Sequence, residues 1–221
     1  MKPNIGFALL LAFGIAASAV AAPSSNVAWT VETKRFVEGG NADRGKGLAA
    51  DCASCHGENG VSPSDKWPSL AGQASAYTFK QLRDYHDSKR ANAIMAALSG
   101  QLSEQDIADL AAYYSQQVPP AKQDTQAPAP AIEKLTVIGD GERLMPACDA
   151  CHGRRGTGNP RSIGMPSLAG QKAQYLAATL RAYRSGDRAN DVYSVMRSIA
   201  GQLTDEEILG LSNYYAAQEP R

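Results

Sequence analysis

Apolar side chains recur at helical spacing in two segments that lie about one hundred residues apart. Each segment places apolar or small residues at i, i+3, i+4 and i+7, the stripe of a helix with one buried face. The two stripes are Ile107, Leu110, Ala111 and Tyr114, and Ile208, Leu211, Ser212 and Tyr215. A hydroxyl residue followed three positions later by an acid precedes each stripe, which predicts capped helix starts at Ser103 and Thr204.

Further helices are expected upstream of each stripe. One should run over 74–88, because Tyr77, Leu82 and Tyr85 recur at the same spacing as Tyr175, Leu180 and Tyr183. Short helices are expected over 44–54 and 141–150. No segment shows the strict alternation of a β-strand, so the sequence predicts an all-α protein. Three short helices per half would make a thin core, which indicates that another group fills part of it.

The two halves are copies of one another. Pro68-Ser-Leu-Ala-Gly-Gln73 recurs as Pro166-Ser-Leu-Ala-Gly-Gln171, and an Arg-Ala-Asn triplet ends at Asn92 and again at Asn190. The second copy has gained two residues in one loop and three in another. We therefore predict two tandem domains, 41–118 and 135–221, joined over 119–134 by a Pro-rich extended linker.

The N-terminal segments carry different signals. Residues 1–22 contain Lys2, an uncharged run from Ile5 and a small-residue end, which predict a secretory signal peptide and export to the periplasm. An uncleaved anchor is the alternative, because the run is nearly long enough to span a membrane. Residues 23–40 form an extension with Trp29 and Phe36 that could be a tail, a strap across one domain or a docking segment.

Composition argues against a nucleic-acid partner and against a membrane span after the signal. The chain has 22 basic and 22 acidic residues, so no basic face for nucleic acid is expected. No later segment is apolar enough to cross a membrane, although peripheral association remains compatible with the sequence.

All four cysteines belong to two C-x-x-C-H motifs, which are Cys52, Cys55 and His56, and Cys148, Cys151 and His152. This motif attaches haem c. Two sulfurs three positions apart at a helix end can reach the two vinyl groups on one porphyrin edge, and the following His then points at the iron. The sequence therefore predicts two covalently bound haem c groups.

Three other interpretations of the cysteines fit less well. A disulfide within each motif would close a very small ring and leave the repeated His unexplained. A thioredoxin-like pair needs a βαβ context, which is not visible. Four Cys and two His are too many ligands for one tetrahedral zinc site.

The sixth iron ligand separates electron transfer from catalysis, since a vacant position would permit peroxide or O₂ chemistry. Met95 and Met196 occupy matching places in the repeat and are the candidates. Met145 is too close to Cys148 to reach the opposite haem face, and Met165 occupies the place of Trp67, where packing is expected. His86, which Arg184 replaces in the other copy, is expected to be a solvated helix residue, with a bis-His site as the minor alternative.

Together these motifs resemble the class I c-type cytochromes, specifically the dihaem cytochrome c4 type, over about 41–218. The resemblance implies two class I cytochrome c domains, each a few helices wrapped around one haem, with a helix crossing that Gly45 and Gly141 permit. It implies axial ligation by His56 with Met95 and by His152 with Met196. It also implies hydrogen bonds from the imidazoles to the carbonyls of Pro68 and Pro166, and haem pockets lined by Leu70 and Leu168.

The sequence leads to three functional hypotheses. The first is a periplasmic carrier of single electrons between an upstream cytochrome complex or dehydrogenase and a terminal oxidase. The second is the electron-accepting subunit of a periplasmic dehydrogenase, perhaps one that oxidises a sulfur compound, with 23–40 as an interface. The third is a dihaem peroxidase, which the Met in each half disfavours.

Overall fold

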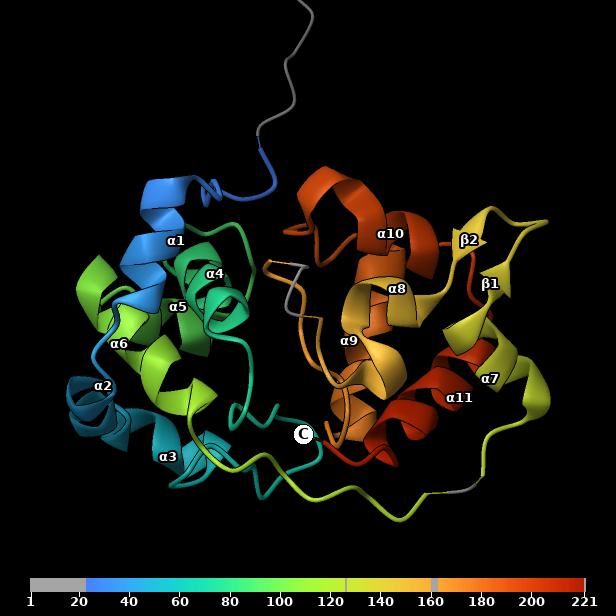
Figure 1. Ribbon diagram of the computed structural model, residues 1–221. Coiled ribbons are helices and arrows are strands. Elements are labelled where there is room, and N and C mark those ends of the chain that lie inside the picture. The colour runs from blue at the N-terminus through green and yellow to red at the C-terminus, as the bar shows by residue number, and fades with distance from the viewer. Residues whose placement is uncertain (1–22, 126, 160–162, 221) are drawn as a thin grey trace, which may run out of the picture.

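The computed structural model describes residues 23–125, 127–159 and 163–220, so the predicted signal over 1–22 lies outside the described residues. Two helical domains lie side by side, and an extended segment runs beneath them from the first to the second (Figure 1). The mainly helical architecture confirms the predicted fold class, with one two-stranded hairpin as the exception among the described residues.

The first domain is built on the close crossing of its second and last helices. Its elements are α1 (Val31–Glu38), α2 (Ala42–Leu48), α3 (Ala50–His56), α4 (Ser75–His86), α5 (Ala93–Ser99) and α6 (Glu104–Ser115). The apolar stripe of α6 is fully buried, and Ile107 and Leu110 are at most 1 % exposed. The expected middle helix over 74–88 is α4.

The second domain repeats this plan but begins with different N-terminal elements. Its elements are α7 (Pro130–Val137), β1 (Gly139–Asp140), β2 (Met145–Pro146), α8 (Cys148–His152), η1 (Arg154–Gly156), α9 (Ala173–Ser185), η2 (Val192–Ser194), α10 (Val195–Ala200) and α11 (Asp205–Ala216). The strands pair antiparallel, Gly139 with Pro146 and Asp140 with Met145. Ile132 and Leu135 of α7 pack into a core with Ile208 and Leu211 of α11.

Both C-terminal helices begin where the sequence predicts. The Ser103 hydroxyl accepts from the amide of Asp106, whose carboxylate accepts in return from the Ser103 amide. Thr204 and Glu207 form the same reciprocal pair at the start of α11. Two of the amides that an isolated helix start leaves unpaired are thereby satisfied in each copy.

The prediction of a helix over 141–150 is wrong. The N-terminal helix of the second domain is α7, which begins inside the segment predicted to be an extended linker, and the β1–β2 hairpin occupies most of 139–146. Pro130 stands in the first turn of α7, where its missing N–H costs nothing, so the Pro-rich composition concealed a helix start. Met145 lies in β2 and is buried, rather than on the helix that carries the cysteines.

The prediction that Gly45 and Gly141 allow the same helix crossing in the two domains is also wrong. A Cβ on Gly45 would lie 2.1 Å from the Asp109 carbonyl oxygen of α6, so the α2–α6 crossing requires this glycine, whereas a Cβ on Gly141 would meet nothing within 4 Å. In the second domain the crossing glycine is Gly210 on α11, where a Cβ would lie 2.6 Å from Ile132 of α7. The small residue has moved from one helix of the pair to the other.

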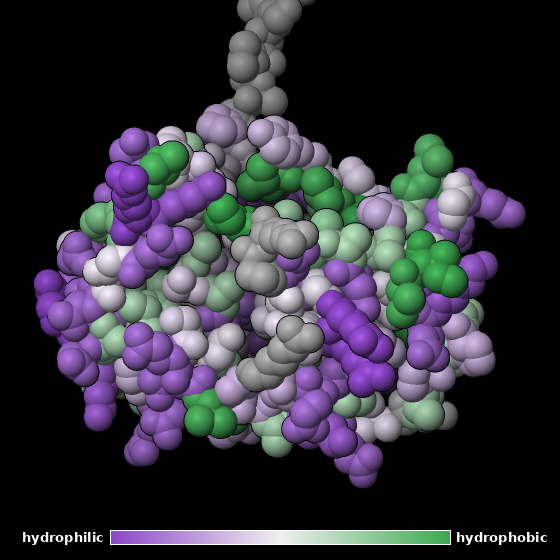
Figure 2. All heavy atoms as spheres, viewed as in Figure 1, coloured by the Kyte–Doolittle hydropathy of each residue, from purple (hydrophilic) through white to green (hydrophobic). Residues whose placement is uncertain are grey.

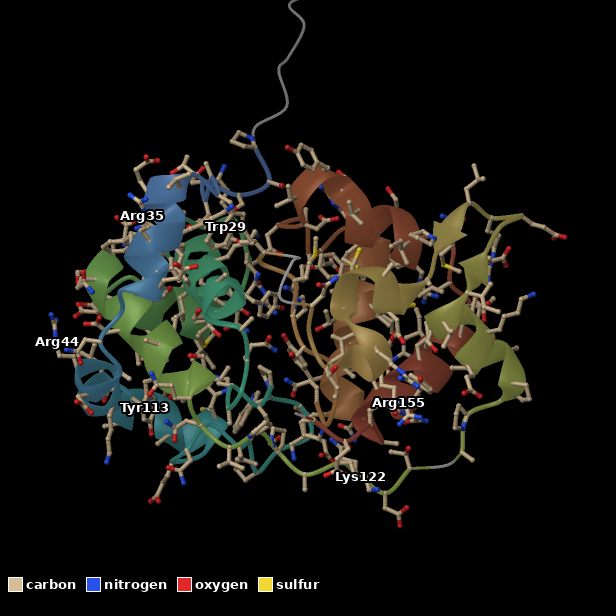
Figure 3. The ribbon with its side chains drawn as sticks, viewed as in Figure 1. Trp29, Arg35, Arg44, Tyr113, Lys122 and Arg155 are labelled. Carbon is tan, nitrogen blue, oxygen red and sulfur yellow. The ribbon has the colours of Figure 1, made fainter. Side chains whose placement is uncertain are left out.

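The extension over 23–40 is a strap across the first domain. Trp29 and Phe36 pack against Phe79 of α4, with ring centroids 6.5 and 6.1 Å apart. Trp29 lies beside α1 on the side toward the second domain (Figure 3), and a Cβ on Gly164 would come within 3.1 Å of its indole nitrogen. The strap therefore covers the first domain and reaches a loop of the second.

The chain between the domains follows the second domain closely. The amide of Gln123 donates to the carbonyl of Ala216, and the Thr125 hydroxyl donates to the carbonyl of Asn213.

Apolar side chains are exposed along the α7–β1–β2 edge (Figure 2), with Leu144 88 % and Ile138 71 % exposed. Within the described part of the chain, every helix is too short or too polar to span a bilayer.

Candidate haem-binding sites

The first candidate site is the end of α3. Cys52 and Cys55 are separated by three positions of this helix, and His56 is its last residue. Gly57 follows with φ +83°, a conformation that a side chain would strain, and a Cβ there would lie 2.1 Å from the Val61 carbonyl oxygen. The chain therefore turns sharply after the histidine and leaves the imidazole at the end of the helix.

The imidazole of His56 is fixed by one hydrogen bond. Its Nδ1 lies 2.8 Å from the carbonyl oxygen of Pro68. Because a carbonyl only accepts, Nδ1 carries the proton and Nε2 keeps its lone pair. Burial lowers the pKa of His56, and the Pro68 carbonyl only partly opposes this, so the ring is neutral near pH 7. A neutral, oriented imidazole with a free Nε2 is what an iron ligand requires.

The second candidate site has the same construction. Cys148 and Cys151 lie in α8, and His152 ends the helix before Gly153, which has φ +77°. His152 Nδ1 lies 3.0 Å from the carbonyl oxygen of Pro166, and burial lowers the pKa of this imidazole too. The hydrogen bonds that the family resemblance implied from His56 and His152 are therefore both present.

The cysteines are chemically available for thioether bonds. All four are free thiols in the structure and half-buried. Burial raises the pKa values of Cys52 and Cys148, which disfavours thiolates. Among the described residues, no cluster of three or more His, Cys, Asp or Glu side chains is arranged to hold a metal ion.

The two candidate methionine ligands lie at the starts of matching helices. Met95 lies in the first turn of α5, where its amide donates to the Asn92 side chain at 2.9 Å. Met196 is the second residue of α10. Both side chains are half-buried, as is Met165, whereas Met145 is a core residue. The iron-ligand roles of Met95 and Met196 stay a prediction that the repeat supports.

His86 lies at the surface, as expected. It ends α4, it is exposed, and its Nδ1 is 2.8 Å from a carboxylate oxygen of the neighbouring Asp87. His86 therefore has a local hydrogen-bond partner at the surface, as expected for a solvated helix residue.

Sequence reasoning missed a glycine in each site. Gly60 and Gly156 have φ +78° and +73°, and a Cβ on either would lie 2.7 or 2.6 Å from the ring of Tyr114 or Tyr215. Each glycine carbonyl also accepts the amide of the leucine predicted to line the pocket, at 2.6 Å for Leu70 and 2.7 Å for Leu168. The signal was available, because both glycines stand four positions after the motif histidine.

The tyrosines beside these glycines pack close to the attachment cysteines. Tyr114 is only 1 % exposed and packs in one cluster with Cys52 and Leu70. Tyr215 packs near Cys148 and Leu168, and its hydroxyl donates to Asp149 at 3.1 Å. Burial is the main cause that raises the pKa values of both phenols, which are therefore neutral.

The two sites differ in the charge beside them. Glu58 and Asn59 follow the first motif, whereas Arg154 and Arg155 follow the second. Arg155 points outward from the second domain in Figure 3, and both arginines are exposed. One attachment loop thus carries an acidic side chain, and the other carries two basic ones.

The residues present fit haem c. Each site offers two thiols at the spacing of a porphyrin edge, one neutral imidazole with a free Nε2 and a thioether on a separate helix. Thiol, imidazole and thioether are the donor set of a covalently attached, His/Met-ligated haem. A porphyrin would cover apolar side chains, and several large ones are exposed around the first site: Val61, Trp67, Ile94 and Leu98.

Comparison with known proteins agrees with this chemistry. A family model described as cytochrome c matches the chain twice, over residues 42–117 and 138–216, which is more than half of it. Cytochrome c4 of Pseudomonas aeruginosa is 40 % identical over 179 residues, covering 79 % of this chain and 87 % of the relative. The thiosulfate dehydrogenase electron acceptor of Thiomonas intermedia (strain K12) is 37 % identical over 178 residues, covering 77 % and 79 %.

A solved structure matches the whole two-domain arrangement. Reduced recombinant cytochrome c4 from Pseudomonas stutzeri superimposes with a TM-score of 0.75 at 36 % identity, covering 81 % of this chain and all of that one. The match extends over both domains and not over a single copy of the repeat.

Proposed function

This chain belongs to the cytochrome c family, in its dihaem cytochrome c4 branch, and we propose on that basis that it is a periplasmic carrier of single electrons with two His/Met-ligated haems. The family assignment makes it an electron-transfer protein with two covalently bound haem c groups. Four elements are our proposal: the ligand pairs, the periplasmic location, the domain limits and the redox partners. The observation that carries the ligand assignment is the repeated imidazole–carbonyl bond, from His56 to Pro68 and from His152 to Pro166.

The chain's own residues define how the carrier works. The haem iron supplies the Fe(II)/Fe(III) couple. Cys52 and Cys55 would hold the haem through thioether bonds, and the Pro68 carbonyl holds the imidazole of His56 in a single tautomer and orientation. Because Met95 lies at the start of a separate, capped helix, the chain would hold both the imidazole of His56 and the thioether of Met95 in place in either oxidation state. Little movement on electron transfer is the property a carrier needs.

The test is a visible spectrum of the purified full-length protein with haem quantified per chain. We expect two covalent haems and a far-red Met–iron band in the oxidised form. Met95→Ala and Met196→Ala should each remove about half of that band. Met165→Leu is the matched control, since Met165 is equally half-buried but precedes Pro166 outside the two helices, and it should leave the band intact. A band unchanged in Met95→Ala or Met196→Ala would refute the ligand assignment.

A dedicated dehydrogenase partner is the second candidate function. It is favoured by similarity to a protein described as the electron acceptor of thiosulfate dehydrogenase. Mixing the oxidised protein with a purified thiosulfate dehydrogenase and thiosulfate should then reduce both haems, while an enzyme blank without thiosulfate should not. The strap over 23–40 lies on the chain's own first domain, so this candidate no longer needs it as an interface.

Two further measurements address the rest of the proposal. Osmotic-shock fractionation should release the mature protein with the periplasmic contents, and mass spectrometry should place its new N-terminus near residue 23. Carbon monoxide should bind slowly or not at all to the reduced protein. Rapid binding to one haem would instead revive the peroxidase hypothesis.

A further inference from the structure

The two domains meet through a nearly symmetric set of hydrogen bonds. Gln171 accepts from the amide of Ser69 and donates to its carbonyl, both at 2.9 Å. Gln73 accepts from the amide of Ser167 at 2.9 Å and donates to its carbonyl at 3.0 Å. The glutamine of each Pro-Ser-Leu-Ala-Gly-Gln segment therefore forms hydrogen bonds with the backbone of the other segment. This pairing alone would make the joint the same seen from either domain.

Arginines and tyrosines extend the same symmetry. Arg90 donates to the hydroxyl of Tyr175, and Arg188 donates to that of Tyr77, each at 3.2 Å. Arg188 also lies over the ring of Tyr183, 4.5 Å from its centroid, as Arg90 does over the matching ring in the first domain. These residues come from matching positions of the repeat, so each domain contributes the same arginine and tyrosine contacts to the joint.

One buried cluster breaks the symmetry. Lys80 and Asp84 of α4 form an ion pair at 2.5 Å with side chains at most 5 % exposed. The matching positions on α9 are Ala178 and Ala182, which have no polar side chain. The first domain thus supplies a charged pair that the second domain cannot reciprocate.

Asn190 receives this pair from the second domain. Lys80 donates to the Asn190 carbonyl at 2.6 Å, and the Asn190 amide donates to the Asp84 carboxylate at 2.6 Å. Asn92, its counterpart, instead caps α5 by accepting from Met95. Three inserted residues between Asn190 and Met196 separate Asn190 from the start of α10, which frees its side chain for the joint.

The N-terminal strap completes the cluster. The Ser25 hydroxyl donates at 2.5 Å to the second carboxylate oxygen of Asp84. Asp84 is fully buried and Asn190 is 1 % exposed, so the carboxylate exchanges water for partners from α4, the second domain and the strap. A buried carboxylate satisfied by three separate segments holds those segments in one arrangement, because losing any partner leaves charge uncompensated.

We propose that Asp84 is a positioning residue that locks the two cytochrome domains in one relative orientation, with Ser25 of the strap completing the lock, and that electron exchange between the two haems depends on it. The dependence on electron exchange rests on the proposed function. The lock itself does not, since it is defined by side-chain contacts between the domains.

Amide hydrogen exchange on the haem-loaded, full-length protein tests the lock directly. The Ser69 and Ser167 amides donate across the joint, so they exchange when the domains separate. Asp84→Asn keeps the shape but leaves Lys80 without its counter-charge. We expect exchange at both serines to accelerate on the order of 100-fold, because breaking one side of a buried pair is strongly unfavourable. Amides at Ile107 and Ile208, inside the two domain cores, should keep their protection.

Two other variants separate the lock from general damage. Asn190→Ala removes the side-chain hydrogen bond from the second domain to Asp84 while leaving the Lys80–Asp84 pair and the Asn190 carbonyl in place, and it should also open the joint. Asp87→Asn is the matched control. Asp87 follows α4 directly and accepts from Asn26 of the strap, but its hydrogen-bond partners Asn26, Arg83 and His86 all belong to the first domain and the strap. It should leave Ser69 and Ser167 protected.

Electron exchange between the haems is the second readout. NMR exchange spectroscopy of half-reduced protein should show a slower inter-haem rate in Asp84→Asn and Asn190→Ala, but not in Asp87→Asn. Unchanged serine protection in both joint variants would overturn the lock. Lost protection with an unchanged inter-haem rate would overturn the electron-transfer role. Failure of the carrier function itself would show separately, as missing haem or an altered far-red band in the unmodified protein.

Discussion

Adding one methyl group at Gly45 is the sharpest test of the first domain's architecture. A Cβ there would lie 2.1 Å from the Asp109 carbonyl oxygen, 2.6 Å from its carbonyl carbon and 2.8 Å from the Tyr113 Cβ. Two of the three atoms are backbone of α6, which cannot rotate aside. Gly45→Ala must therefore push α2 away from α6 by about 1 Å or more before ordinary van der Waals contact is restored.

The size of the effect follows from two opposing contributions. Overpacking of this kind costs about 1–3 kcal/mol, and a backbone obstacle places it at the upper end. Alanine in a helix interior recovers about 1 kcal/mol relative to glycine. Gly45→Ala should therefore lower the free energy of unfolding of the first domain by about 2 kcal/mol. Gly47, two positions along the same helix, meets nothing within 4 Å, so Gly47→Ala should raise it by up to about 1 kcal/mol.

Tryptophan fluorescence during guanidinium unfolding follows the first domain, because Trp29 and Trp67 are the protein's two tryptophans and both precede the linker. Gly141→Ala, at the position matched by the sequence repeat, should leave the first-domain transition unchanged. If Gly45→Ala unfolds at the same denaturant concentration as Gly47→Ala, the close helix crossing is not what stabilises this domain.

Three further outcomes are expected. Arg154→Glu with Arg155→Asn, which installs the first domain's residues, should slow oxidation of the reduced protein by hexacyanoferrate(III) at low salt and weaken its ionic-strength dependence, measured by stopped flow. The Arg143 hydrogen bond lowers the pKa of Glu207, so the second domain should lose stability as pH falls below about 4.5, and Arg143→Gln should flatten that loss in acid titrations followed by circular dichroism. Ser103→Ala should cost about 1 kcal/mol by removing the cap of α6, seen as a lower first-domain unfolding midpoint.

The sequence predicted those parts of the fold that depend on local chemistry. The capped starts of α6 and α11 and the helical stripe behind each cap are decided within about a dozen residues. The attachment motifs are equally local, because the spacing of Cys52, Cys55 and His56 is what the chemistry requires. The placement of His86 at the surface followed instead from the repeat, in which Arg184 takes its place.

The entrance to the second domain could not be predicted from the repeat. A fixed offset placed Gly141 opposite Gly45, but the β1–β2 hairpin displaced the helix to Pro130–Val137. Tertiary packing decides this, because Ile132 finds its partner at Gly210, about eighty residues away. The Lys80–Asp84 pair was equally hidden. In the sequence it is an i,i+4 pair typical of a solvated helix face, and only the second domain makes it buried.

The positions at which the two copies differ indicate how the duplication is used. The imidazole–carbonyl bond is the same in both halves to within 0.2 Å, since 2.8 Å at His56 compares with 3.0 Å at His152. Apart from the helix and hairpin that open the second domain, the copies diverge at the joint, where Ala182 stands in the place of Asp84, and at the attachment loops, where Arg154 replaces Glu58. Two equal haem sites on one symmetric joint would give electrons no preferred direction. Under the proposed function, an asymmetric joint between an acidic and a basic loop would let each domain face a different partner while the two domains keep one relative orientation.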